Sequence, residues 1–332
     1  MTNSIPVIDV QDFPAQSGKL VAACEEWGCF RIINHGISTA LMSDMHTVGN
    51  ALFDRPMEIK QRTTNPDIPD RGYIANDGGS SSAVLTSSAP LPIPRQQRET
   101  KQREFLYESL GLYDPASHGA IDAFYDQLEL FPKQRETIMR YINATHGLAM
   151  SIGCKLAESM GLVESDLFKG WACQYRLNKY NFNPHTLGRT GVPIHTDSGF
   201  LTIVQDDGGV GGLEVVDKIT GNLVPIDPMP GTLLVNLGDI AKAWSNGRFY
   251  NVTHRVVNKA SGEERLSIVL FVLGPKEAAV EAPAEIVDSD DPNSCRRGLY
   301  VPFTFEQYRM LRNSTRSKAG EALHLLRTTN EY

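Results

Sequence analysis

The second half of the chain is a series of short runs rich in Val, Ile, Leu and Phe, separated by residues typical of tight turns. Gly208-Gly209, Thr220-Gly221 and Asn246-Gly247 each follow or separate such runs. Many short strands with frequent turn signals favour a jelly roll of two sheets or a barrel. The predicted strands cover residues 201–205, 212–217, 222–225, 232–237, 251–257 and 266–273.

Helices are predicted on both sides of this β region, because apolar residues recur there with helical spacing. Two short strands, residues 5–10 and 29–33, are expected among the helices of the first third. The predicted fold class is therefore mainly β with flanking helices, and the last helix is expected to cover the sheet. The predicted helices cover residues 19–27, 41–62, 120–130, 134–160 and 304–326.

Residues 75–103 interrupt the pattern with a Gly- and Ser-rich stretch, three prolines and a charged run. Such a segment is expected to be a polar insertion, either a lid or a loop without fixed structure. We expect one compact globular unit in three parts. A mixed α/β region, 1–172, contains the insertion; a jelly-roll core spans 173–275; a C-terminal segment with the covering helix spans 276–332.

The charge pattern limits the kind of partner. The net charge is −7 and no block of Lys or Arg occurs, which argues against nucleic acid or an anionic membrane. A small-molecule substrate is the expected partner, and no protein partner is inferred. The start of the chain shows no basic segment followed by an apolar one, so a cytoplasmic location is expected. Five cysteines without a Cys-x-x-Cys pair predict reduced thiols.

His195 and Asp197 are two positions apart, so in an extended segment both side chains point to the same face and can bind one ion. Chance alone gives such a pair a fair probability in a chain with eight histidines, and a hydrogen-bonded pair on a surface strand is the alternative. His254 lies on a predicted strand of the same region and can supply a third ligand. Two histidines and one carboxylate are the ligand set of non-haem Fe(II) oxygenases.

Arg265 and Ser267 repeat the same two-residue spacing on another predicted strand. A guanidinium can hold a carboxylate through two parallel hydrogen bonds, and a hydroxyl adds a third. The alternative is a surface ion pair between Arg265 and Glu263 or Glu264. The apolar sequence that follows makes an unpaired cation costly, which favours a charged ligand at this position.

The combined pattern resembles the plant iron- and 2-oxoglutarate-dependent dioxygenase family, which is similar to isopenicillin N synthase. The resemblance extends over nearly the whole chain, apart from residues 75–103. The motifs that carry it are His195-Thr196-Asp197, His254, Arg265-x-Ser267, Ile5-Pro6-Val7-Ile8-Asp9, Trp27-Gly28-Cys29-Phe30 and Asn34-His35-Gly36-Ile37.

The resemblance implies a distorted double-stranded β-helix, which is a cupin-like jelly roll. It implies Fe(II) held by His195, Asp197 and His254, with 2-oxoglutarate and O2 as co-substrates and ascorbate as a candidate reductant. Arg265 and Ser267 would hold the far carboxylate of 2-oxoglutarate. The stretch from Arg176 to Asn181 resembles the family's R-x-N-Y-Y-P, which would make Tyr180 a further donor to the co-substrate. Lys179 and Asn181 depart from the usual Tyr and Pro.

Within the family, four segments are most similar to the dioxygenases for auxin oxidation, which convert indole-3-acetic acid to its 2-oxindole form. These segments are 106–114, 195–202, 211–215 and 243–248. A small aromatic plant metabolite is therefore the expected substrate, and the resemblance favours indole-3-acetic acid or its conjugates. An indole acetate also needs a cation, for which Arg31, Arg71 and Arg176 are candidates. The aromatic residues proposed near the iron to contact a flat ring are Tyr107, Phe182, Phe200, Trp244 and Phe303.

Three alternatives stay open at this level. The same family chemistry could hydroxylate, demethylate or desaturate another plant hormone or specialised metabolite. An oxidase of the same fold could use ascorbate instead of 2-oxoglutarate, since that branch also has Arg-x-Ser. A non-catalytic binding protein could retain the fold, because a fold by itself does not define a function.

Overall fold

The computed structural model describes residues 5–65, 71–76, 106–162, 166–259, 263–287 and 298–328. Within these residues the strands form two sheets, one of eight strands and one of four. The larger sheet contains, in spatial order, β1 (Val7–Asp9), β2 (Cys29–Ile33), β10 (Leu233–Leu237), β7 (Leu201–Gln205), β12 (Arg265–Pro275), β5 (Trp171–Tyr180), β4 (Tyr107–Tyr113) and β3 (Tyr73–Asn76). The smaller sheet contains β6 (Thr190–His195), β11 (His254–Val257), β8 (Leu213–Val216) and β9 (Leu223–Pro225).

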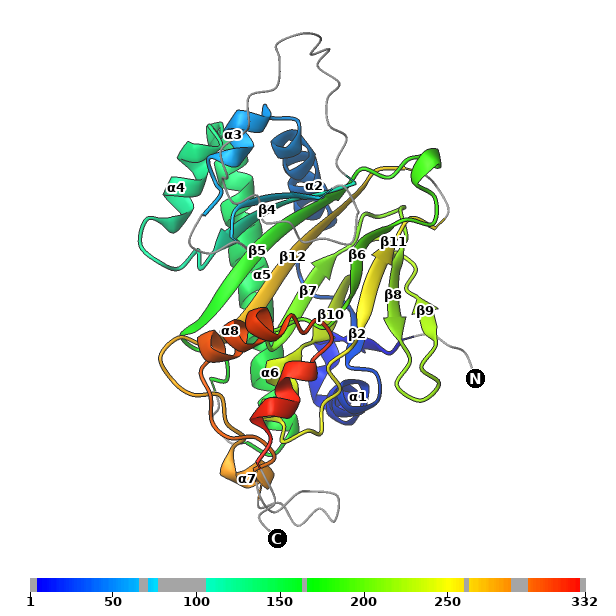
Figure 1. Cartoon of the computed structure of the whole chain (residues 1–332), viewed down its shortest axis with the longest axis vertical. Helices are drawn as coiled ribbons and strands as arrows, with labels where there is room; N and C mark the ends of the chain where they lie inside the picture. The colour runs from blue at the N-terminus through cyan, green and yellow to red at the C-terminus, as the bar shows by residue number, and fades with distance from the viewer. Residues whose placement is uncertain are drawn as a thin grey trace.

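The pairing is antiparallel throughout, except between β1 and β2, which pair in parallel. Figure 1 shows the smaller sheet to the right of the larger one. This arrangement confirms the predicted jelly roll with flanking helices.

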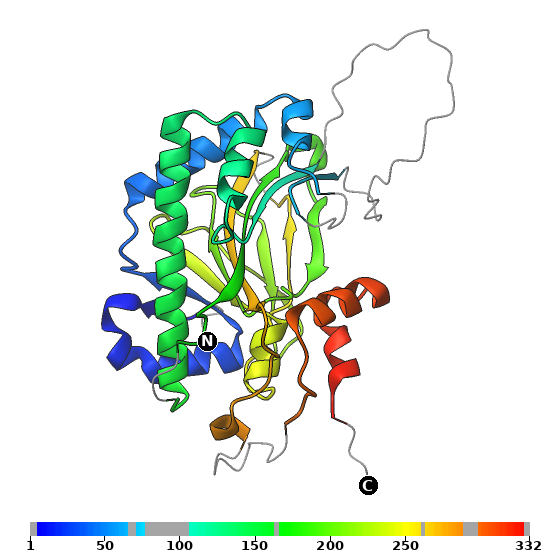
Figure 2. The ribbon, with the colours of Figure 1, turned by 90° about the vertical axis from the view of Figure 1, so that its left-hand side faces the viewer.

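Helices cover the outer face of the larger sheet. They are α1 (Phe13–Glu26), α2 (Thr39–Phe53) and the long α5 (Pro132–Ser159), which runs along that face in Figure 2. Apolar side chains of these helices share one core cluster with Leu266, Ile268 and Leu270 of β12. The layer buries the apolar helix stripes that the sequence pattern predicts.

The helix ends follow from local sequence. The Ser38 hydroxyl accepts a hydrogen bond from the Leu41 N–H at 3.2 Å and caps α2. Pro132 begins α5, where its missing N–H leaves no helical bond unmade. Pro56 precedes α3 (Met57–Gln61), so the single helix predicted over 41–62 is divided into α2 and α3. Three further short helices are α4 (Ala120–Gln127), α6 (Asp239–Trp244) and α7 (Ala284–Val287).

The opposite face of the larger sheet points to the smaller sheet. Alternation along β12 directs Arg265, Ser267 and Val269 to this inner face, because Leu266 and Ile268 lie in the helix-covered core. Val269 packs in a second apolar cluster with Val215 and other side chains of the smaller sheet. The space between the sheets is therefore lined by the inner residues of both.

The single C-terminal helix predicted over 304–326 is wrong. α8 (Phe305–Thr315) ends where Arg316 adopts a left-handed conformation with a φ of 55°, and a separate 3-10 helix, η3 (Glu321–Leu326), follows Gly320. The break lets the backbone at Lys318 accept a hydrogen bond from the Thr196 N–H at 2.8 Å. A tertiary contact thus ends the helix.

Other element boundaries also differ from expectation; α1, for example, begins at Phe13 and not at residue 19. Ala75 and Asn76, which were predicted to belong to the insertion, are part of β3, and the remaining residues of that prediction, 77–103, lie outside the described residues. The strand predicted from 251 begins only at His254. The predicted elements did not include β3, β4, β5, β6, α6 or α7. No described helix is long and apolar enough to cross a membrane.

Candidate metal centre and co-substrate site

His195, Asp197 and His254 meet at one point between the sheets. His195 ends β6 and His254 begins β11, and the two residues are direct partners in the antiparallel ladder. Each offers one ligand atom together with Asp197, and these atoms lie within 4.8 Å of one another. The Asp197 Oδ1 atom is 3.7 Å from His195 Nε2 and 3.8 Å from His254 Nε2. The three predicted ligands are thus brought together.

Hydrogen bonds orient all three side chains toward that point. His195 Nδ1 is 2.8 Å from the Pro193 carbonyl, and His254 Nδ1 is 3.2 Å from the Val252 carbonyl. An Nδ1–H donated to a carbonyl leaves the Nε2 lone pair free to bind a metal. The Thr202 hydroxyl donates to Asp197 Oδ2 at 2.6 Å, which leaves Oδ1 facing the two imidazoles.

The electrostatic environment keeps His195 neutral. Burial, reinforced by neighbouring His254, lowers the pKa of His195 to about 4. A neutral imidazole is the form that binds a metal ion. Two Nε2 atoms and one carboxylate oxygen occupy one side of a metal ion and leave further positions open, so the donor set fits Fe(II).

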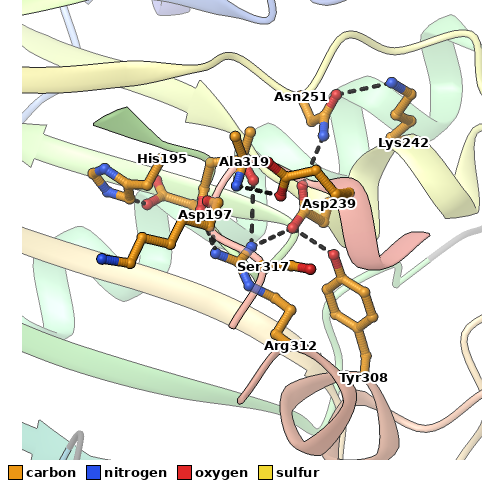
Figure 3. Close-up of polar contacts among 12 residues, drawn as sticks. His195, Asp197, Asp239, Lys242, Asn251, Tyr308, Arg312, Ser317 and Ala319 are labelled. Atoms are coloured by element: carbon orange, nitrogen blue, oxygen red, sulfur yellow. Dashed lines mark hydrogen bonds and ion pairs between the residues drawn. The ribbon is translucent and has the colours of Figure 1, made fainter. Parts of the chain in front are cut away.

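A polar network supports the turn that carries the ligands. In Figure 3, Arg312 extends from α8 between Asp239 and this turn. Its Nη2 atom donates to the Thr196 and Lys318 carbonyls, each at 3.0 Å, and Nη1 forms an ion pair with Asp239. The fully buried Asp239 also accepts from Tyr308 Oη at 2.6 Å and from Asn251 Nδ2 at 2.7 Å. The C-terminal segment therefore braces the backbone between His195 and Asp197.

Arg265, Ser267 and Tyr180 lie together on the inner face of the larger sheet. Arg265 pairs with Tyr180 across β12 and β5, and Ser267 pairs with Asn178. The Arg265 guanidinium carbon lies 5.1 Å from the centre of the Tyr180 ring. Burial raises the pKa of Tyr180 far above its usual value, and the charge of Arg265 together with hydrogen bonds from Ser267 and Arg265 offsets this only in part. The phenol is therefore a neutral hydrogen-bond donor.

Arg265 is a buried cation with unused donors. Arg265 is only 2% exposed to solvent, and its Nη2 atom donates to Asp206 Oδ1 at 3.1 Å. Its Nε and Nη1 atoms are buried without a hydrogen-bond partner in the protein. Buried polar groups are nearly always satisfied, so this guanidinium is suited to a bound carboxylate. The alternative pairing of Arg265 with Glu264 does not occur, since Glu264 pairs with Lys179 at 3.1 Å.

The departures from the family motif have structural partners. Lys179 pairs with Glu264, and Asn181 Nδ2 donates to Glu108 Oε2 at 3.1 Å. Asn178 Oδ1 accepts from Tyr107 Oη at 2.8 Å and from Ser109 Oγ at 2.9 Å. Two donors on Oδ1 fix the amide orientation of Asn178 beside Tyr180.

The five aromatic candidates separate into two groups. Tyr107 and Phe182 pack on Tyr180 between the sheets, each with ring centroids 5.4 Å from it. Phe200 and Trp244 pack on each other at 5.4 Å in the helix-side core, which also contains Phe303. The structure therefore brings two of the five beside the Arg265 site.

Three residues of the site were not predicted from the sequence: Thr202, Asp206 and Arg312. Thr202 carried a weak signal, because it is a polar residue inside an apolar strand that follows Asp197. Asp206 gave no local sign of its contact with Arg265. Arg312 lies 116 positions from Thr196 along the chain, so no local pattern could relate them.

The fold and the site together define a jelly-roll enzyme with an open metal site and a cation for an anionic co-substrate. Two family models match the chain: the 2OG-Fe(II) oxygenase superfamily over residues 171–274, and the N-terminal region of non-haem dioxygenases in morphine synthesis over residues 5–115. The chain belongs to the 2OG-Fe(II) oxygenase superfamily, and is a 2-oxoglutarate-dependent dioxygenase that uses Fe(II).

Similar proteins come from rice and Arabidopsis. The chain is 41% identical to the "2-oxoglutarate-dependent dioxygenase DAO" of Oryza sativa subsp. indica, over 96% of this chain and 97% of that protein. The crystal structure of the rice dioxygenase for auxin oxidation is 39% identical, covers 98% of this chain and 100% of that chain, and has a TM-score of 0.81. The dioxygenase for auxin oxidation 1 of Arabidopsis thaliana, bound to 2-oxoglutarate, is 46% identical over 87% of this chain and 100% of that chain, with a TM-score of 0.73.

Proposed function

We propose that this dioxygenase oxidises a small aromatic carboxylate, with indole-3-acetic acid or one of its conjugates as substrate and the 2-oxindole form as product. The main structural support for the enzyme class is that two features occur together. One is the set of three oriented metal ligands, and the other is the buried Arg265 guanidinium, whose Nε and Nη1 have no hydrogen-bond partner. The substrate assignment is supported by the similarity to the rice and Arabidopsis proteins named for auxin oxidation.

Each group of side chains has a separate task in this proposal. His195, Asp197 and His254 hold Fe(II) on one side, and Thr202 keeps the second carboxylate oxygen of Asp197 away from the metal. Bound Fe(II), with 2-oxoglutarate and O2, supplies the oxidation, in which the keto acid becomes succinate and CO2. Arg265 and Ser267 hold the far carboxylate of 2-oxoglutarate.

Tyr180 donates a hydrogen bond to the same co-substrate. Its ring is 2% exposed and packs between Tyr107 and Phe182, so its hydroxyl has little freedom to turn away. Phe182 also excludes water from this side of the site, because it is 3% exposed and apolar. A dry site strengthens the hydrogen bonds that orient a charged ligand.

The aromatic surface for the substrate is proposed to include Tyr107, Phe182 and Phe271. Phe271 is half-buried on the inner face of β12, where it pairs with Thr202, the residue that holds Asp197. Phe271 therefore lies on the strand next to β7, which follows the turn that carries Asp197. Phe200, Trp244 and Phe303 are proposed to support the site through core packing and not to contact substrate.

Arg176 is the best placed of the three cation candidates for a substrate carboxylate. It shares the inner face of β5 with Asn178 and Tyr180, and pairs with Val269 of β12, two residues before Phe271. Arg31 is buried and its guanidinium donates to Thr232 and Asp227. Arg71 stacks on the Tyr113 ring, with its guanidinium carbon 3.2 Å from the ring centre.

The test is substrate-dependent release of succinate over a panel headed by indole-3-acetic acid and its amino-acid conjugates. We expect succinate and the 2-oxindole product in equal amounts, and only when Fe(II), 2-oxoglutarate and O2 are all present. Indole-3-acetamide, which has no carboxylate, should be a poor substrate. Oxidation that continues without 2-oxoglutarate would instead indicate an ascorbate-using oxidase.

The Arg176→Gln variant tests the proposed carboxylate contact. We expect its KM for indole-3-acetic acid to rise on the order of tenfold or more, because a charge-assisted hydrogen bond is lost. Its affinity for 2-oxoglutarate should stay within about twofold of the unsubstituted enzyme. An unchanged KM would remove Arg176 from the substrate site. If only other aromatic metabolites release succinate, the enzyme class holds and the auxin assignment fails.

A further inference from the structure

Arg31 lies against the proposed co-substrate site although it comes from the N-terminal part of the chain. It is on β2, and its residue surface is 3% exposed. Its Nη1 donates to Thr232 Oγ1 at 2.9 Å, and its Nη2 donates to the Asp227 carbonyl at 2.8 Å. Both bonds fix the guanidinium, so its charge is held in one place.

Asp206 lies between Arg31 and Arg265. Its Oδ1 accepts from Arg265 Nη2 at 3.1 Å, and its Oδ2 is 3.5 Å from Arg31 Nη1. The side chain of Arg31 is 4% exposed, that of Asp206 is 7% exposed and that of Arg265 is 2% exposed. Like the free atoms of Arg265, Oδ2 of Asp206 is buried without a hydrogen-bond partner. The arrangement is a buried row of charges, positive, negative and positive.

The carboxylate of Asp206 has two opposite effects on the site. It orients Arg265 by occupying Nη2, which directs the remaining donors elsewhere. Its negative charge also repels a second carboxylate arriving at the same guanidinium, because charges interact strongly where water is excluded. A nearby cation that is not itself available to the ligand would cancel this repulsion.

The neighbouring Asp207 adds to the negative charge near Arg265. Its Oδ2 accepts from the Leu266 N–H at 2.9 Å, and its Oδ1 is 3.5 Å from His46 Nε2. Asp207 is partly exposed, so solvent screens it more than Asp206. The buried Asp206 therefore dominates the repulsion of an incoming carboxylate.

We propose that Arg31 sets the affinity for the distal carboxylate of 2-oxoglutarate by neutralising Asp206, so that Asp206 can position Arg265 without repelling the co-substrate. Arg31 is a positioning residue that acts through Asp206. The inference rests on the proposed function, in which Arg265 binds that carboxylate. Arg31 thus affects co-substrate binding in addition to forming an ion pair with Asp206.

The experiment measures dissociation constants of keto acids for the Fe(II)-loaded enzyme under anaerobic conditions, by calorimetric titration. The ligands are 2-oxoglutarate and 2-oxovalerate, which has a similar chain but no distal carboxylate. We expect Arg31→Met to weaken the binding of 2-oxoglutarate about tenfold, because the negative charge of Asp206 is then uncompensated. The affinity for 2-oxovalerate should remain within about twofold, since that ligand has no charge at this position.

Matched variants separate charge from structure. Asp206→Asn keeps an acceptor for Arg265 and removes the repulsion, so it should bind 2-oxoglutarate at least as tightly as the unsubstituted enzyme. In the double variant Arg31→Met/Asp206→Asn, the dissociation constant for 2-oxoglutarate should return to within about threefold of that of the unsubstituted enzyme, because both charges of the pair are gone. Arg31→Lys keeps the charge and should lie closer to the unsubstituted enzyme than Arg31→Met.

The proposal is overturned if Arg31→Met weakens both ligands equally, if it weakens neither, or if Asp206→Asn weakens 2-oxoglutarate as much as Arg31→Met does. Should Arg31→Met not fold, the single Asp206→Asn and the double variant still decide the sign of the charge effect. Arg265→Lys is measured in parallel. If both the Arg31 variants and Arg265→Lys leave 2-oxoglutarate binding unchanged, the proposed co-substrate site itself is wrong. If the Arg31 variants leave binding unchanged but Arg265→Lys weakens it, only the Arg31 inference fails.

Discussion

His195 and His254 are direct cross-strand partners, and their ring centroids lie 4.2 Å apart. The pairing of β6 with β11 therefore places two metal ligands side by side. Asp197 completes the set from the turn that follows β6, and the Thr202 hydroxyl holds its second oxygen at 2.6 Å. The geometry of the ligands depends on strand pairing and on a few hydrogen bonds, and each of these can be tested separately.

Thr202→Val keeps the shape of the side chain and removes the hydrogen bond to Asp197. We expect Fe(II) affinity to fall about 10- to 100-fold, because the carboxylate loses the partner that orients it. Anaerobic metal titration measures this directly. Thr202→Ser retains a hydroxyl and should bind Fe(II) nearly as well as the unsubstituted enzyme. Equal affinity in the Val variant would show that Asp197 needs no such support.

Arg265→Lys replaces a planar fork of donors by one ammonium group. We expect a loss of about 1.5–3 kcal/mol in 2-oxoglutarate binding, which is about ten- to 150-fold in affinity. Anaerobic calorimetry of the Fe(II)-loaded enzyme measures the change, and Fe(II) affinity serves as the control, because the metal ligands are untouched. Unchanged 2-oxoglutarate affinity would contradict the assignment of Arg265.

Arg312→Met leaves the buried carboxylate of Asp239 without its cation. We expect the free energy of unfolding to fall by about 3–5 kcal/mol, because one partner of a buried pair remains uncompensated. The double variant Arg312→Met/Asp239→Asn should recover part of this stability. Its Fe(II) affinity should nevertheless stay below that of the unsubstituted enzyme, since Thr196 has lost its brace. Chemical denaturation and metal titration give the two quantities independently.

Glu108 should make stability depend on pH. Burial raises its pKa, but hydrogen bonds from Lys60, Tyr73 and Asn181 outweigh this and hold the pKa below the ordinary value of 4.5. A lowered pKa means that the ionised form stabilises the fold above pH 4.5, and that this contribution disappears as the pH falls through the folded-state pKa. Glu108→Gln should therefore destabilise the protein by about 3–5 kcal/mol at pH 7.

The difference between Glu108→Gln and the unsubstituted protein should narrow below pH 4.5, as measured by denaturation at a series of pH values. Glu129→Gln is the matched control, because Glu129 pairs with Arg62 at the surface, where both side chains are about half exposed. That change should cost less than about 1 kcal/mol at any pH. A gap for Glu108 that does not vary with pH would mean that its charge is not what stabilises the fold.

The strands were predictable where one local pattern decides them. The run 201–205 matches β7 at both ends, because Leu201, Ile203 and Val204 form an apolar run that is bounded by turn sequences. β6 was not predicted, because Gly191 and Pro193 interrupt its sequence and only pairing with β11 makes it a strand. α6 was missed for a similar reason: it is six residues long and lies against Asp197 and Gly199 through backbone hydrogen bonds.

The sequence by itself determined the ligand types and their local spacing. Arg265 and Ser267 share a face because side chains alternate along β12, whereas Asp197 reaches the ligand site from the turn that follows β6. Only the tertiary structure decided that Arg31 flanks Asp206 and that Arg312 supports Thr196. These contacts join residues far apart in the chain, and they follow from which strands pair and in what register. The pattern within one strand indicates which side chains face the core, but it does not identify the partner strand, because pairing between distant strands depends on the packing of the whole core.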